Sequence, residues 1–313
     1  MRTMVTGATG FVGQALIRRM AADGRHAVRA AVRAETCTLP AGVECVVAGD
    51  LVNLNGDAAW QATVSGMDAV VHLAARVHVM RESASDPLSE FRRVNVTASL
   101  KLAKQAAAAG VRRFVYLSSV KVNGESGTYT ESHTPAPEDA YGISKHEAEM
   151  GLRGIADETG LEVVIIRPPL VYGPGVGANF RALMRAVARG IPLPFGAVDN
   201  RRSLAAVDNL VDFVLTCLEH RAAANETFLV SDGEDLSTTD LIRRIADAMG
   251  RPARLIPMPV SVLLATATAL GKRDIARRLL GSLQVDISKA RRMLHWAPPI
   301  SVDEGLKRAV AAL

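Results

Sequence analysis

Residues 3–13 read TMVTGATGFVG, a short apolar run followed at once by glycines at positions 7, 10 and 13. Glycines at this spacing, between a strand and a helix, let the backbone turn sharply and come close to a pyrophosphate at the helix N-terminus. The stretch therefore predicts the phosphate loop of a dinucleotide-binding fold. The residues expected to contact the cofactor here are Gly7, Thr9, Gly10, Phe11, Val12 and Gly13.

Beyond this loop, short β-branched runs alternate with alanine-rich stretches of helical period. We expect strands at 3–6, 27–32, 44–48, 69–73, 113–118 and 162–167, with helices at 12–22, 94–109 and 141–159. Strands that alternate with helices form parallel sheets covered on both faces, with right-handed crossovers. The sequence thus predicts an α/β fold with a Rossmann-type, doubly wound parallel sheet.

After residue 167 the sequence pattern changes, because prolines and glycines interrupt the alternation of strands and helices. We expect residues 1–171 to form the NAD(P)-binding domain, and 202–231 to return to it with a helix at 207–218 and a strand at 227–230. Residues 172–201 and 232–313 should then form a smaller, partly discontinuous substrate lobe. The longest apolar run, 260–270, is far shorter than the ~20 residues of a membrane span, and we interpret it as a buried or interfacial helix.

Composition excludes several classes of protein. The 313 residues carry 37 basic side chains, 30 of them arginine, against 32 acidic ones, a net charge of +5 that suits an anionic small molecule. No dense basic tract or interleaved aromatic pattern indicates nucleic acid, and we expect no membrane partner. The three cysteines match neither a disulfide framework nor a metal site, which favours a cytoplasmic location and no bound metal.

The end of the second strand discriminates between cofactors, since an acidic residue there binds a ribose hydroxyl and an arginine accommodates a 2′-phosphate. Arg33 stands at this place, and the stretch from Arg29 to Ala34 contains no Asp or Glu. NADP(H) is therefore favoured, and NAD(H) remains possible. His72, at the end of the fourth strand, is more simply a hydrogen-bonded core histidine than a catalyst. Further cofactor contacts are expected from Asp50 and Leu51 at the adenine, and from Leu73, Ala74 and Ala75 along the sheet edge.

The chemistry is predicted to lie at Ser119, Tyr141 and Lys145. Tyrosine and lysine at i and i+4 share one face of a helix. A neighbouring ammonium favours phenolate and lowers the tyrosine pKa, so Tyr141 could exchange a proton with a carbinol or carbonyl oxygen near neutral pH. The Ser119 hydroxyl would hold the same oxygen.

With these motifs the chain resembles the extended short-chain dehydrogenase/reductase family over essentially its whole length. The resemblance implies that Asn95 shapes the helix beside the site, that Lys145 also binds the nicotinamide ribose, and that Ser118, Pro168 and Val171 border the cofactor. Residues 167–175, 178–180, 193–196 and 207–210 match segments that hold the nucleotide and diphosphate in relatives that act on nucleotide sugars, and Arg202 suits a phosphate. The substrate contacts expected on this basis are Val77, His78, Ser119, Asn123, Tyr141, Asn179, Phe180, Leu193, Phe195 and Arg202.

Nucleotide-sugar dehydratases of this family carry Thr-Asp-Glu where this chain has Ser119-Val120-Lys121. The missing acid and base argue against dehydration and leave reduction or epimerisation at C4. Arg33 favours the phosphorylated cofactor of a reductase, and residues 121–125 with 167–173 most resemble bacterial enzymes of polysaccharide (O-antigen) gene clusters that reduce the C4 ketone of a UDP-4-keto-6-deoxy-N-acetylhexosamine. A UDP-glucose or UDP-N-acetylglucosamine 4-epimerase with retained NAD is the alternative. A reductase of non-sugar ketones and a non-catalytic dinucleotide sensor are less favoured.

A homodimer is also expected, because the helices 94–109 and 141–159 carry small residues on more than one face and could form a four-helix bundle across a two-fold axis. The stripes proposed for this contact are Ala98, Leu102, Gln105 and Ala109 on the first helix and Glu147, Met150, Gly151 and Leu152 on the second.

Overall fold

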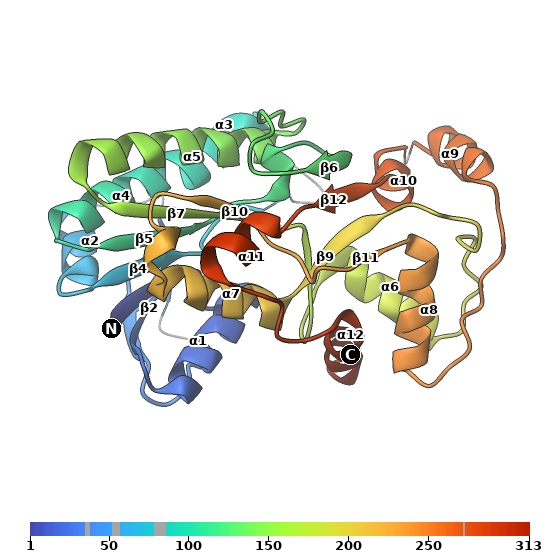
Figure 1. Ribbon diagram of the computed structural model, residues 1–313, viewed down its shortest axis with the longest axis horizontal. Helices are drawn as coiled ribbons and strands as arrows, with labels where there is room; N and C mark the ends of the chain where they lie inside the picture. Colours follow the sequence, from blue (N-terminus) through green and yellow to red (C-terminus); the bar gives the residue numbers. More distant parts are fainter. Residues whose placement is uncertain (35–37, 52–56, 78–85, 272) are drawn as a thin grey trace.

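The computed structural model describes residues 1–34, 38–51, 57–77, 86–271 and 273–313. Its larger sheet has seven parallel strands in the order β10-β7-β5-β4-β1-β2-β3 (Figure 1). The predicted Rossmann-type fold is confirmed, and the six predicted strands begin and end within a residue of their expected bounds. The strands are β1 (Arg2–Thr6), β2 (Ala27–Val32), β3 (Glu44–Val47), β4 (Ala69–His72), β5 (Arg113–Leu117), β7 (Glu162–Arg167) and β10 (Thr227–Leu229).

Every strand of this sheet except the edge strand β3 is mostly buried because both faces are covered, and successive side chains enter different cores. Val5, Val71 and Val115 face α1 (Phe11–Asp23), α7 (Val207–Glu219) and α11 (Ser288–Leu294). Met4, Val70 and Phe114 face α2 (Asp57–Val64), α4 (Ser99–Ala108) and α5 (Ala140–Thr159). These two helical layers lie below and above the sheet in Figure 1.

The helix expected at 94–109 is more complex than predicted. It is preceded by α3 (Pro87–Phe91) and starts as a π-helical segment, η1 (Arg92–Ala98), before α4 continues it. Short π-helical segments within α-helices are frequent at functional sites, and this one holds Asn95, which is fully buried.

The stripes proposed for dimerisation mostly face inward. Ala98, Leu102 and Gln105 are buried within the protomer, and so is Leu152. A Cβ on Gly151 would lie 2.6 Å from the Leu100 side chain, so this glycine serves the packing of α4 on α5. The expectation that these residues form an outward face is therefore wrong.

A second sheet lies beyond the carboxyl ends of the large one. Its strands follow the order β11-β9-β12-β6, and β8 also pairs with β9. The strands are β6 (Gly127–Tyr129), β8 (Leu170–Tyr172), β9 (Arg202–Ala206), β11 (Asp235–Leu236) and β12 (Leu283–Val285). Residues 202–206 thus pair in the second sheet, while α7 and β10, which follow them in the chain, pack on the large sheet and extend it.

Three helices pack against β8 and β9 around a separate core: α6 (Ala178–Ala188), α8 (Thr238–Ala248) and α12 (Val302–Ala311). Two short 3-10 turns, η2 (Val120–Val122) and η3 (Arg221–Ala223), complete the regular elements together with α9 (Val260–Ala269) and α10 (Arg273–Leu280). The apolar run at 260–270 does form a helix, but none of the ten residues of α9 is buried, so of the two alternatives, a buried or an interfacial helix, the buried one is wrong. No helix in the described part of the chain is both long and apolar enough to cross a membrane.

Candidate active site

The glycine loop is packed so closely that side chains would not fit. Gly7 has φ +67°, and a Cβ on it would lie 2.7 Å from the backbone nitrogen of Ala74. A Cβ on Gly13 would lie 2.1 Å from the carbonyl oxygen of Gly7. The helix α1 starts behind Gly10 with no side-chain cap and no acidic residue in its first turn, so its N-terminal N–H groups and dipole suit an anion. This loop fits the pyrophosphate of a dinucleotide.

His72 is a core histidine, as expected. Its Nδ1 lies 2.6 Å from Thr6 Oγ1 and its Nε2 lies 2.8 Å from Ser99 Oγ. Burial lowers the pKa of His72 to about 3, so the ring is neutral at physiological pH. The ring thereby ties β1, β4 and α4 together just below the strand ends, where Thr6 Oγ1 also accepts the N–H of Ala74.

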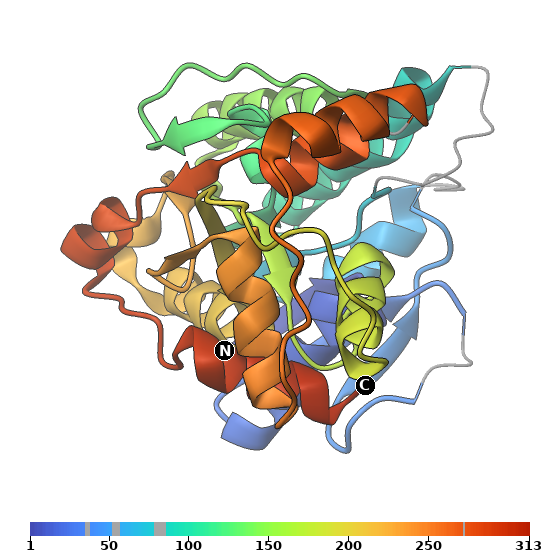
Figure 2. The same ribbon diagram turned by 90° about the vertical axis from the view of Figure 1, so that its right-hand side faces the viewer.

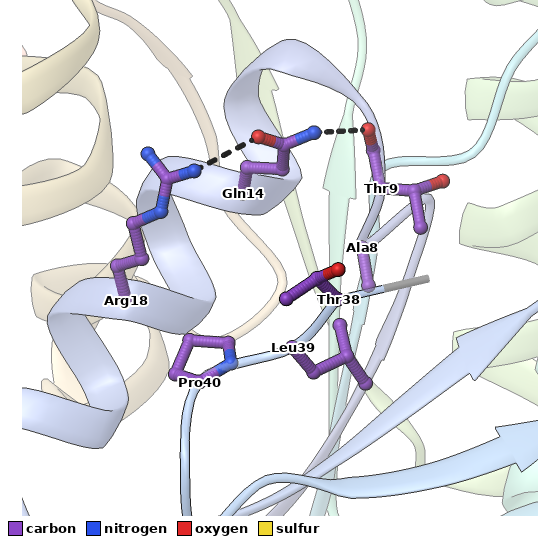
Figure 3. A pocket seen from close by; sticks show the side chains of 7 residues that line it. All are labelled: Ala8, Thr9, Gln14, Arg18, Thr38, Leu39 and Pro40. Carbon is purple, nitrogen blue, oxygen red and sulfur yellow. Dashed lines mark hydrogen bonds between the residues drawn. The ribbon is translucent and has the colours of Figure 1, made fainter. Parts of the chain in front are cut away.

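At the far end of the dinucleotide site, Arg33 after β2 and Asp50 after β3 are both exposed, while Leu51 packs partly into the core. A pocket of about 700 Å³ lies between the glycine loop and residues 38–40 (Figure 3). Of its seven lining residues the sequence predicted only Thr9, and the polar side chains that it missed next to the loop are Gln14 and Arg18. Gln14 Nε2 donates to Thr9 O at 2.8 Å, and Arg18 Nη2 donates to Gln14 Oε1 at 3.1 Å. The i, i+4 spacing of Gln14 and Arg18 directly after the loop is the signal that could have found them.

The three predicted catalytic side chains meet above the ends of β5 and β7. The Lys145 ammonium is buried, donates to Leu117 O at 2.7 Å, and lies 6.0 Å from the centre of the Tyr141 ring. Burial lowers the pKa of Lys145 to about 7. Ser119 stands at the start of η2, where its Oγ accepts the N–H of Lys121 at 3.2 Å.

The expected lowering of the Tyr141 pKa is wrong for the protein's own groups. Burial, followed by the charge of Asp139, raises the pKa of Tyr141 to about 12, and a hydrogen bond with Ser119 opposes this only in part. Desolvation penalises the phenolate, and the partly neutral Lys145 is too distant to offset it. Tyr141 therefore holds its proton.

Asn95 connects the segment after β4 to the helix of Tyr141. Its Oδ1 accepts the Arg76 N–H at 2.8 Å, and its Nδ2 donates to Arg76 O and to Ser144 Oγ, both at 3.0 Å. Ser144 Oγ in turn donates to Tyr141 O at 2.8 Å. The π-helical segment thus aims Asn95 at the first turn of α5, in keeping with the shaping role that the family resemblance implies.

Ser118 and Asn123 belong to a buried ionic network. Ser118 Oγ donates to Glu149 Oε1 at 2.5 Å, and Arg167 donates to both oxygens of Glu149 at 2.9 and 2.5 Å. Arg167 Nη1 also donates to Asn123 Oδ1 at 3.1 Å. The Ser118 hydroxyl and the Asn123 carbonyl, which we expected to contact cofactor and sugar, are therefore used to join β5, β7, α5 and η2. The Asn123 Nδ2 is buried and has no hydrogen-bond partner among the described residues.

A cluster of three cations and two carboxylates lies next to Ser119. Lys121 Nζ pairs with Asp139 and, at 2.7 Å, with Glu125. Arg278 Nε lies 3.8 Å from Glu125. Arg202 donates to Gly281 O at 2.9 Å, and burial lowers its pKa although Glu125 opposes this. Of the three cations, sequence reasoning proposed only Arg202; the Lys121–Glu125 spacing signalled the first pair, whereas no local pattern indicated Arg278.

The other expected substrate and cofactor contacts are spread out. Val77 is 61% exposed and Asn179 is exposed, whereas Phe180 is buried and stacks on Tyr172 with 5.4 Å between ring centres, so its ring does not face an open site. His78 lies outside the described residues. Residues that are half-buried at these edges are Phe11, Val12, Leu73, Ala74, Ala75, Val171, Leu193 and Phe195, and Pro168 is buried with its carbonyl oxygen bonded to the Val120 N–H. Among the described residues, no group of three His, Cys, Asp or Glu side chains could hold a metal ion.

A dinucleotide loop, a Ser–Tyr–Lys cluster and a second lobe over the strand ends define an enzyme of the extended short-chain dehydrogenase/reductase type. The chain belongs to the NAD-dependent epimerase/dehydratase family, whose model matches residues 3–231. It is 44% identical to a UDP-glucose 4-epimerase of Vibrio cholerae over 99% of this chain and 94% of the relative.

Two solved structures share the fold. The UDP-glucuronic acid 4-epimerase of Bacillus cereus, in complex with NAD, superposes with a TM-score of 0.80 at 21% identity, over 100% of this chain and 98% of that one. The UDP-glucose 4-epimerase of Thermotoga maritima, with UDP-glucose, gives 0.79 at 22% identity, again over 100% and 98%.

Proposed function

We propose that the protein is a nucleotide-sugar 4-epimerase that uses tightly held NAD. The observation that carries the proposal is the 44% identity, over nearly the whole of both chains, to a UDP-glucose 4-epimerase, combined with an intact Ser119, Tyr141 and Lys145 cluster. The comparisons favour this alternative over the 4-ketone reductase that the sequence alone favoured.

The chain's own groups suit proton exchange at a sugar hydroxyl. Tyr141 keeps its proton with a pKa of about 12, ready to donate it to a ketone oxygen at C4, and Ser119 can hold that same oxygen. Lys145, whose pKa burial lowers to about 7, is held by Leu117 O with its Nζ 6.0 Å from the centre of the Tyr141 ring. NAD would be held by the glycine loop at the start of α1 and would supply the hydride acceptor and donor for C4, while its positive charge would favour the Tyr141 phenolate that oxidation of the sugar hydroxyl needs.

Elimination of water is disfavoured by what stands beside Ser119. Val120 is buried, and Lys121 places an ammonium, paired with Glu125 and Asp139, where a dehydratase has its acid and base. The net positive cluster of Lys121, Arg202 and Arg278 suits the diphosphate of a nucleotide sugar, because arginine binds phosphates through several hydrogen bonds. We therefore infer that the substrate is a UDP-hexose or UDP-N-acetylhexosamine.

A turnover assay distinguishes epimerisation from net reduction. Purified protein is incubated with UDP-glucose or UDP-N-acetylglucosamine without added cofactor, and in parallel with UDP-4-keto-6-deoxy-N-acetylglucosamine and NADPH. Formation of the C4 epimer without net change in nicotinamide absorbance is expected. Stoichiometric oxidation of NADPH by the keto sugar, with no epimerisation, would instead establish the reductase.

A further inference from the structure

The helix α9, with the sequence VSVLLATATA, is mostly apolar and uncharged, and yet it stands at the surface. None of its residues, Val260–Ala269, is buried, and Val262 is 45% exposed. Leu270 at its end is 66% exposed, and Ile256 before it is 47% exposed. Helices that are apolar all round are normally covered by a protein core or by lipid. Within the described structure α9 packs on α10, and six of its ten residues are exposed while the other four are half-buried.

The segment around α9 also has no charged side chains, and two of its hydroxyl groups are hydrogen-bonded within the helix. No charged residue occurs between positions 255 and 271. The hydroxyls of Thr266 and Thr268 donate to Val262 O and Leu264 O, each at 2.8 Å, so they are satisfied within the helix. This surface can therefore be desolvated without leaving these donors unpaired.

Basic residues frame this apolar segment. The stretch 251–280 has six Lys and Arg against one Asp, 6 − 1 = +5, while the rest of the chain balances 31 basic against 31 acidic residues. The whole net charge of the protein is thus concentrated here. Arg251 and Arg254 are exposed and donate only to the backbone carbonyls of Ala188 and Gly190, and Arg277 is exposed as well. None of these three guanidinium groups is paired with a carboxylate of the described residues.

The positive surface continues onto α6. Arg181, Arg185 and Arg189 recur every fourth residue, are exposed, and line a hollow of about 450 Å³ together with Ile191, which is 45% exposed. The bonds from Arg251 and Arg254 fasten residues 251–254 to the C-terminal end of α6. Figure 2 shows this end of the molecule, where the chain leaves α8, passes α6 and rises to α9.

We propose that α9, with the arginines of α6 and with Arg251, Arg254 and Arg277, forms a docking surface for an anionic phospholipid bilayer. An uncharged apolar helix with basic flanks lies in the headgroup region, where its side chains meet the acyl boundary and its arginines meet lipid phosphates. This surface departs from the sequence-based expectation that no membrane is a partner, and it needs no spanning helix. It shares α10 with the candidate site, because Arg278 of α10 approaches Glu125 and Asp139.

Vesicle flotation tests the proposal without reference to catalysis. Vesicles of phosphatidylglycerol and phosphatidylethanolamine are compared with vesicles of phosphatidylcholine alone, at low and at high salt. The full chain is expected to float with the anionic vesicles and to be released by salt. The uncharged double variant Val262→Gln/Leu270→Gln should lose about tenfold or more in partitioning, whereas Leu313→Gln, an exposed apolar residue elsewhere, should not.

A second pair of variants tests the contribution of the arginines to vesicle binding. Arg254→Gln/Arg277→Gln should weaken anionic binding by about fivefold per arginine, while Arg19→Gln/Arg25→Gln removes equal charge from α1 and its end and should change it little. Equal losses in both pairs would show nonspecific attraction of a basic protein. Failure of the wild type to float would overturn the proposal. Concentration-dependent self-association that is lost in Val262→Gln/Leu270→Gln would also overturn it, and would show that a second copy of the chain covers α9.

Discussion

Tyr141 is the residue whose protonation decides whether the site can act as acid or base. Replacing it with phenylalanine keeps the ring that packs edge-on against Phe91, with 6.0 Å between ring centres, and removes only the hydroxyl. We predict that kcat of Tyr141→Phe falls about 10²–10⁴-fold, the usual contribution of general acid–base catalysis. Steady-state kinetics and a dinucleotide titration measure this, with dinucleotide binding expected to stay close to wild type. Retention of more than about a tenth of the rate would show that another group handles the proton.

Arg33 tests the cofactor choice. It is exposed after β2, at the place where a guanidinium can meet a 2′-phosphate. If it does so, Arg33→Ala should weaken NADPH binding by about 1–3 kcal/mol, the range for hydrogen bonds to charged groups, and leave NADH binding nearly unchanged. Titrations followed by nicotinamide fluorescence compare the two cofactors. Equal effects on both would mean that Arg33 is a solvated surface residue, as expected of an epimerase that holds NAD.

Among the elements, the junction of β1, β4 and α4 depends on a neutral His72. Its folded pKa of about 3 lies below the ordinary value of 6.5, so between these pH values the unfolded chain binds one more proton. The free energy of unfolding should therefore fall as the pH drops through this window, by about 2 kcal/mol between pH 7 and pH 5 from this group alone.

The His72→Gln variant cannot titrate and should lack that part of the pH dependence, even if it is less stable at pH 7. Urea unfolding of both proteins at pH 7, 6 and 5 isolates the difference. Parallel pH profiles for the two proteins would mean that the imidazole is charged or accessible in the folded state.

Some helices and strands were predictable from the sequence and others were not. The strands of the large sheet were predictable because strands buried on both faces are continuous apolar runs, and the glycine loop because only glycine fits its close contacts. The π-helical turn at Asn95 was not, since a change of hydrogen-bond register within a helix leaves no mark in the hydrophobic pattern. Ala98 and Leu102 were misplaced for a related reason: a stripe of small residues looks the same whether it faces the sheet or a partner.

The sequence predicted that Ser119, Tyr141 and Lys145 would come together, but it did not predict the electrostatics of this group. Motif spacing located Ser119, Tyr141 and Lys145, but the raised pKa of Tyr141 comes from burial and from Asp139, which only the folded arrangement shows. Likewise, Arg278 approaches Glu125 across more than 150 positions of the chain, a contact that no local pattern encodes.

At the scale of the whole molecule, the expected homodimer now depends on fewer residues than the sequence suggested. Of the apolar side chains proposed for the contact, Met150 on α5 remains 51% exposed, while Leu152 is buried within the protomer. We predict that the wild type scatters light at micromolar concentration with twice the 33.3 kDa mass of one chain. Met150→Arg should dissociate such a dimer, because two like charges would face each other across the two-fold axis.

This dimer and the lipid-docking surface occupy different elements, so the two predictions can be separated. Leu270→Gln should leave the dimer mass unchanged, because α9 lies far along the molecule from α5 (Figure 1). The Met150→Arg monomer should still bind vesicles through its single α9 surface. Its apparent partitioning should be lower than that of the wild type, because a dimer presents two such surfaces to one vesicle. A mass near 33 kDa for the wild type would remove the dimer. A mass that falls only in Leu270→Gln would move the contact from α5 to α9 and leave α9 unavailable to lipid.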